Sequence, residues 1–117
     1  MDNEPTKNDL EIVPNEYEGT DYEVNVSIPE FNCICPRTGL PDFATIKINY
    51  IPNKYIVELK SLKLYIVKFR NIGIFHESAT NKIFKDFQES CNPKQIEVIG
   101  EFSARGGIFT IVKVNSK

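Results

Sequence analysis

Apolar and polar residues alternate along several stretches of this 117-residue chain, and a period of two predicts β-strands. The clearest run spans residues 44–50, and after a short turn the chain continues into an apolar segment at residues 55–59. We expect these two segments to form a hairpin. Residues 96–102 and 108–114 also alternate and predict a second hairpin, joined through two glycines. A shorter run at residues 24–28 ends at a proline.

Two stretches between the hairpins carry apolar residues three and four positions apart, the spacing of an amphipathic helix. Ser61 is a suitable N-cap for a helix to about Arg70, and Ser78 for a second helix that ends at Asn92-Pro93. The order strand–strand–helix–helix–strand–strand predicts an α+β fold, an antiparallel four-stranded sheet with both helices on one face. Nothing remains to cover the other face, so we expect copies to join edge to edge into a ring or barrel.

The first 23 residues differ from the rest in charge. They hold eight acidic residues and one lysine, a balance of −7, whereas residues 24–117 carry +5 and the whole chain −2. We therefore divide the chain into an acidic, extended or poorly ordered arm (1–23) and a single domain (24–117). The basic domain favours an anionic ligand, and no nucleic-acid-binding motif or dense basic cluster predicts a nucleic-acid partner.

Composition excludes several classes of protein. No apolar run has the roughly 20 residues of a membrane-spanning helix, and the polar N-terminus does not read as a signal peptide. Three cysteines without an export signal indicate reduced thiols and a cytoplasmic protein. The single histidine, His76, excludes a multi-histidine metal centre within one chain.

Cys35 is the first candidate for chemistry, because it stands in a loop rich in proline and glycine rather than in an apolar period. A loop thiol can act as a nucleophile when a neighbour such as Arg37 favours the thiolate, although most cysteines are buried and inert. Asp42 at the end of this loop could reach back toward the thiol, or bond only to local amides.

Charged residues also gather around the two predicted helix starts. Lys60 and Lys63 flank the first helix start, which is a natural anion site, and Glu58 falls at an inward strand position where a carboxylate needs a partner. Before the second helix, Glu77 could bind a guanidine-like ligand edge with His76 beside it, or simply stabilise the helix.

Three separated motifs resemble the 7-cyano-7-deazaguanine reductase family, the NADPH-dependent nitrile reductases of queuosine biosynthesis. They are residues 35–44 (CPRTGLPDFA), 58–65 (ELKSLKLY) and 75–77 (FHE). The resemblance runs from about Phe31 to the C-terminus and fits the short, single-domain form. It implies the tunnelling fold, active sites at subunit interfaces, and a decamer of two stacked pentamers.

The resemblance also implies residue roles. Cys35 would be the nucleophile that forms a covalent thioimide with the nitrile, and Asp42 the proton donor. Substrate-binding positions would be Val57, Glu58, Leu59, His76 and Glu77, and positions for NADPH would be Lys60, Lys63, Arg105 and Gly106. Leu59 stands where the family often has Ser, which leaves backbone contacts at that position. No metal is required.

Two alternatives stay open. The first is a zinc-dependent, cyclohydrolase-like purine or pterin enzyme of the same fold. Such enzymes hold zinc with Cys and His ligands in motifs that this chain lacks. A separate zinc site could be drawn from Cys33, Cys35, His76 and Cys91, with weak metal-ligand spacing. The second alternative is a non-catalytic ligand-binding module that keeps the fold.

Overall fold

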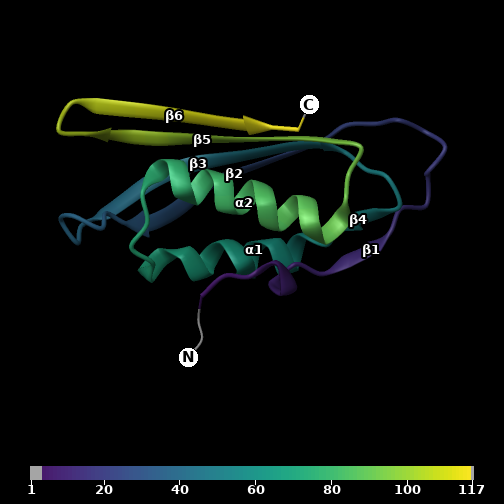
Figure 1. Cartoon of the computed structure of the whole chain (residues 1–117), viewed down its shortest axis with the longest axis horizontal. Coiled ribbons are helices and arrows are strands. Elements are labelled where there is room, and N and C mark those ends of the chain that lie inside the picture. The colour runs from purple at the N-terminus through teal and green to yellow at the C-terminus, as the bar shows by residue number, and fades with distance from the viewer. Residues whose placement is uncertain (1–3, 117) are drawn as a thin grey trace.

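The computed structural model describes residues 4–116, except for the side chains at positions 104 and 105. Its main feature is an antiparallel sheet of four strands in the order β2-β3-β5-β6 (Figure 1). These strands are Val24–Ile34, Pro41–Ile51, Gln95–Arg105 and Ile108–Asn115. The helices α1 (Leu59–Val67) and α2 (His76–Cys91) lie on one face of this sheet (Figure 1), which confirms the expected α+β fold.

The core lies between the sheet and the two helices. Alternate residues of the central strands point toward the helices, among them Ile46, Ile48 and Val98, and all three are fully buried. The helices bury the stripes that the sequence predicts, with Tyr65 of α1 and Ile83 of α2 at 0% exposure. No described helix or strand covers the opposite face of the sheet (Figure 1).

Strand pairing corrects part of the sequence prediction. Residues 55–57 form β4 (Tyr55–Val57), which pairs with β1 (Ile12–Pro14) in a separate two-stranded sheet and not with β3. The partner of β3 is β2, which continues past Pro29 because a β-bulge between Ile28 and Phe31 accommodates the proline. The predicted strand end at Pro29 and the predicted 44–50/55–59 hairpin were therefore wrong.

The described part of the N-terminal segment packs against the body, and of the two expected forms, extended or poorly ordered, it includes an extended strand. A 3₁₀ turn, η1 (Lys7–Asp9), leads to Leu10, which is buried in the core, and then to β1. The buried side chain of Asn15 donates to the carbonyl of Asn53 (2.7 Å) and accepts from the hydroxyl of Tyr22 (2.7 Å). Leu10 and Asn15 thus fix the segment on either side of β1.

Both helices begin earlier than predicted. The Glu58 carboxylate accepts from the amides of Lys60 (2.9 Å) and Ser61 (2.7 Å), so Glu58 is the N-cap of α1 and not an inward strand residue. A 3₁₀ turn, η2 (Lys68–Asn71), continues α1, and α2 starts at His76 without a side-chain cap. None of the described helices is long and apolar enough to cross a bilayer.

Candidate active site

A cavity of about 270 Å³ lies where the β2–β3 and β5–β6 connections meet the start of α2. The residues that line it are Cys35, Asp42, Phe75, His76, Glu77, Ser103, Ile108 and Thr110. Pairing of β2 with β3 sets Asp42 opposite Cys33, two residues before Cys35. The fold therefore brings four of the residues singled out from the sequence, Cys35, Asp42, His76 and Glu77, to one cavity.

A tight turn presents the Cys35 thiol. Its amide donates to the carbonyl of Leu40 (2.9 Å), and its carbonyl accepts from the amide of Gly39 (2.9 Å), whose φ of 75° favours glycine. The hydroxyl and amide of Thr38, together with the amide of Arg37, lower the pKa of the Cys35 thiol below its usual value. The surroundings thus favour the reactive thiolate, and Arg37 contributes through its backbone.

Asp42 and His76 form a pair at the inner end of the cavity. The Asp42 carboxyl group is largely buried, and its Oδ2 lies 3.1 Å from Nε2 of His76. The imidazole lies flat on the ring of Phe102, with ring centroids 3.9 Å apart and planes inclined by 6°. Thr80 donates to the carbonyl of His76 (2.9 Å), so both the backbone and the ring of the histidine are fixed.

Glu77 is the second residue of α2 and is exposed at the cavity. An exposed acidic group in the first turn stabilises a helix, and the same carboxylate remains accessible to a ligand with N–H donors. Sequence reasoning did not single out Thr110, which lines the cavity, or Phe102, which stacks on His76. Their positions in alternating strands are typical of ordinary core and sheet residues, so no local signal distinguished them.

The 57–63 segment lies near the end of β3 that is farther from Asp42. The Val57 amide donates to the hydroxyl of Tyr50 (3.3 Å), and Tyr50 lies eight residues along β3 from Asp42. Eight residues of extended strand span about 26 Å. Figure 1 likewise shows the start of α1 beside β4, away from the β2–β3 connection. Within one copy, the segment that holds Val57, Glu58, Leu59, Lys60 and Lys63 is thus separate from the Cys35 cavity.

The residues predicted to bind NADPH divide between these two ends. Lys60 and Lys63 are exposed at the start of α1, where the Lys60 amide is already bonded to Glu58. Gly106 lies in the two-residue β5–β6 turn near the cavity and has a φ of 64°, as a type I′ turn requires. The Arg105 side chain lies outside the described part of the chain.

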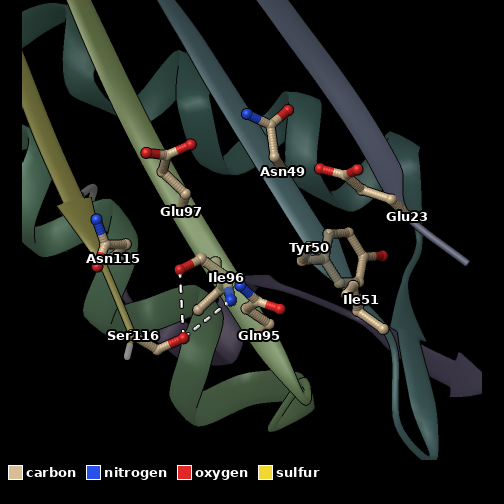
Figure 2. Close-up of a pocket in the computed structure, with 9 residues that line it drawn as sticks. All are labelled: Glu23, Asn49, Tyr50, Ile51, Gln95, Ile96, Glu97, Asn115 and Ser116. Atoms are coloured by element: carbon tan, nitrogen blue, oxygen red, sulfur yellow. Dashed lines mark hydrogen bonds between the residues drawn. The ribbon is translucent and has the colours of Figure 1, made fainter. Parts of the chain in front are cut away.

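A second hollow of about 450 Å³ lies at the opposite end of the sheet from Cys35, and Figure 2 shows its lining. Glu23, Asn49, Glu97 and Asn115 come from four different strands or their flanks, and Ser116 bonds to the backbone of Ile96 beside them (Figure 2). None of the predicted site residues whose side chains the structure describes lines this hollow.

The described residues contain no group of three or more His, Cys, Asp or Glu side chains that could hold a metal ion. The four residues drawn as a zinc site are not brought together, because Cys91 and His76 occupy opposite ends of α2. The 16 residues of that helix separate them by roughly 22 Å.

Comparisons with known proteins point to the family that the three sequence motifs resemble. Residues 41–117 match the model of a family described as QueF-like protein. The NADPH-dependent 7-cyano-7-deazaguanine reductase of Aquifex aeolicus is 54% identical over 94% of this chain and 85% of its own length. The enzymes of the same name from Chloroherpeton thalassium and Anaeromyxobacter sp. (strain K) are 53% and 50% identical. Those matches cover 88% and 96% of this chain, and 89% and 91% of the relatives.

A solved structure, the archaeosine synthase QueF-Like in its apo form, superposes with a TM-score of 0.72. The match covers 82% of this chain and 92% of that chain at 19% sequence identity. At this identity the likeness shows a shared fold, the tunnelling fold that the motifs implied.

Proposed function

The chain belongs to the 7-cyano-7-deazaguanine reductase family, and we propose that it reduces the nitrile of 7-cyano-7-deazaguanine to the primary amine with NADPH, as a step of queuosine biosynthesis. The observation that supports this most directly is that Cys35, Asp42 and Glu77, from three separate segments, line one cavity. A nucleophile, an acid and an acceptor for the base edge are the groups that this reaction needs.

The first step uses Cys35 and Asp42. The thiolate of Cys35 adds to the nitrile carbon and forms a C–S bond, while the nitrile nitrogen takes a proton from Asp42. The product is a covalent thioimide, whose C=N group is more polarised than a nitrile. The lowered pKa of the Cys35 thiol and the nearby Asp42 carboxyl support this step.

Conversion of a nitrile to an amine takes four electrons, so NADPH would supply two hydrides in succession. After the first reduction, the C–S bond breaks and Cys35 leaves as a thiolate, which exposes an imine for the second reduction. Asp42 serves each proton transfer to nitrogen. Two NADPH and two protons are consumed for each nitrile.

Binding of the substrate and of NADPH is assigned to the remaining residues. Glu77 accepts N–H groups of the deazaguanine edge beside His76, and Val57, Glu58 and Leu59 line the rest of the pocket. NADPH suits the exposed ammonium groups of Lys60 and Lys63. These side chains, more than the helix amides, would hold its phosphates, because Glu58 already accepts from the amides of Lys60 and Ser61. Arg105 and Gly106 are assigned to the same cofactor.

A complete site on this assignment needs two copies of the chain. The Cys35 cavity and the 57–63 segment lie at opposite ends of one copy, so a neighbouring copy would bring its own segment to the cavity. Strands β2 and β6 are the edges of the sheet, and β6 exposes Ile108, Phe109 and Ile111. We propose assembly through these edges into pentamers that stack as a decamer.

The test is to mix the protein with the nitrile base and NADPH and to follow the loss of nicotinamide absorbance. We expect two NADPH oxidised for each nitrile and, without NADPH, a mass increase of one nitrile base on Cys35. Binding of the base with neither adduct nor turnover would leave a non-catalytic module. Stoichiometric zinc in the active protein would favour the cyclohydrolase-like alternative instead.

A further inference from the structure

The N-terminal segment makes a closed set of hydrogen bonds with the start of α1. The Glu58 amide donates to the carbonyl of Glu11 (2.8 Å), and the Glu11 amide donates to the Ser61 hydroxyl oxygen (2.9 Å). That hydroxyl in turn donates to the carbonyl of Glu58 (2.7 Å). Glu11 is thus bonded to both ends of the turn that begins the helix.

The residues on each side of Glu11 are fixed as well. Leu10 is 6% exposed within the core, and β1 pairs with β4 so that Ile12 lies opposite Val57. Beyond β1, the Asn15 amide donates to the carbonyl of Lys54 (2.9 Å). We call residues 10–15 the N-terminal strap, because they meet the start of α1 at Glu11 and then follow β4 along its whole length.

Among the described residues, the strand that pairs with β4 is β1, which belongs to the strap. In the four-stranded sheet, β3 pairs with β2 and β5, and the two-stranded sheet contains only β1 and β4. A three-residue strand without a partner would leave its amides and carbonyls to water and would be poorly ordered. The order of residues 55–61 therefore depends on a segment more than 40 positions away in sequence.

We propose that the N-terminal strap is a positioning element for NADPH, which holds the 57–63 segment so that Lys60 and Lys63 stand ready for the cofactor. This inference rests on the proposed function, which assigns those lysines to NADPH. Glu11 acts through its backbone and Ser61 through its hydroxyl, and both are positioning residues. Preorganising the backbone that carries the two lysines lowers the entropy lost when the cofactor binds.

The sharpest test replaces the amide hydrogen of Glu11 by the Cδ carbon of a proline ring. Glu11→Pro deletes the donor to Ser61, and Leu10 before it is extended (φ −88°, ψ 115°), a conformation allowed before proline. We expect the KM for NADPH to rise about three- to tenfold, as for the loss of one ordering hydrogen bond, with kcat at saturating NADPH close to wild type. Glu11→Ala keeps the amide and should match the wild type.

Ser61→Ala removes the same bond from the other side, together with the bond from the Ser61 hydroxyl to the Glu58 carbonyl, and Ser61→Thr restores the hydroxyl and should rescue the KM. If both changes act through this bond, the KM for NADPH of the double variant Glu11→Pro/Ser61→Ala should be no higher than that of the single variant with the higher KM. Independent, multiplying effects on KM would show that Ser61 acts on NADPH without the strap and would contradict the proposal.

A purely stabilising role gives a different pattern. Val98→Ala removes buried volume in β5, away from the strap, and should lower the melting temperature while leaving the KM for NADPH unchanged. If Glu11→Pro behaves like Val98→Ala, the strap only stabilises the fold and the proposal is wrong.

The proposed function is tested separately: it fails if the wild-type protein does not oxidise NADPH in the presence of the nitrile. The strap is then judged by hydrogen exchange over residues 57–63 and by NADPH affinity from nicotinamide fluorescence. Glu11→Pro should speed that exchange and weaken that affinity, and unchanged values for both would overturn the inference.

Discussion

The three cysteines have the same side chain, but the fold gives them different reactivities. Cys33 and Cys91 are at most 1% exposed, and burial raises the pKa of each thiol to about 12. Cys35 is partly exposed in its turn, and hydrogen bonds lower the pKa of its thiol. Alkylating reagents attack the thiolate, so they should distinguish the three.

We predict that iodoacetamide near pH 8 modifies Cys35 alone in the folded protein. Mass spectrometry of the native protein should show one added carbamidomethyl group, located on the peptide that contains Cys35. In denaturant all three cysteines should react. Early labelling of Cys33 or Cys91 under native conditions would contradict the burial of these thiols.

Thr38 is predicted to set the pH at which Cys35 becomes reactive. Thr38→Val removes the hydroxyl that lowers the thiol pKa, so this pKa should rise toward its ordinary value. Less thiolate is then present at neutral pH, and the rate of alkylation against pH should shift to higher pH. Thr38→Ser keeps the hydroxyl and serves as control. If the pH dependence of alkylation is unshifted in Thr38→Val, the backbone amides and not the Thr38 hydroxyl lower the pKa of the thiol.

At the scale of elements, one glycine sets how closely α2 approaches the sheet. A Cβ added to Gly100 of β5 would lie 2.6 Å from Oγ1 of Thr80 in α2 and 2.8 Å from Cε1 of Phe102. Both neighbours are fully buried, and both hold His76, Thr80 through the backbone and Phe102 through the ring. The spacing of helix and sheet is therefore linked to the geometry of the cavity.

We predict that Gly100→Ala lowers the free energy of unfolding by about 1–3 kcal/mol, because overpacking forces α2 or Phe102 to move. Urea denaturation followed by circular dichroism measures this. Gly19→Ala, with nothing within 4 Å of the added Cβ, is the matched control and should change the stability little. Equal stability of the two variants would mean that α2 can shift without cost.

Elements with a strong local pattern could be predicted from the sequence, and those that depend on distant partners could not. The stripes of α1 and α2 and the β5–β6 hairpin are encoded within a few neighbouring residues. The pairing of β4 with β1 joins residues about 45 positions apart, and the strand after Pro29 needed a bulge. Glu58 lies between an apolar strand and a helix, so its role as N-cap could not be separated from a strand position.

The candidate site shows the same division. The motifs drew attention to Cys35, Asp42, His76 and Glu77, because they combine loop position with reactive chemistry. The stack of His76 on Phe102 depends on which core residue meets the imidazole in space. An alternating strand contains several equivalent apolar residues, so its sequence does not distinguish Phe102 from the others.

At the scale of the whole molecule, no helix or strand among residues 4–116 covers the second face of the four-stranded sheet, and β2 and β6 are its edge strands. An exposed edge strand with apolar side chains, such as β6, favours pairing with another chain. We predict that light scattering at micromolar concentration reports an oligomer, and that Ile111→Lys on β6 weakens it by placing a charge in the contact. A stable wild-type monomer would contradict the proposed assembly.

The length of β3 has a consequence for mixtures of defective proteins. One end of this strand carries Asp42 and the other contacts Val57, so on the proposed assembly a substitution in either region damages a different half of a site that two copies share. Cys35→Ala and Lys60→Ala/Lys63→Ala should each be nearly inactive alone. When the two variants are refolded together in equal amounts, about a quarter of the interfaces should by chance pair an intact Cys35 with an intact Lys60 and Lys63. The mixture should therefore recover about a quarter of wild-type turnover. If each polypeptide carried a whole centre, the hybrid population would stay as inactive as its parents.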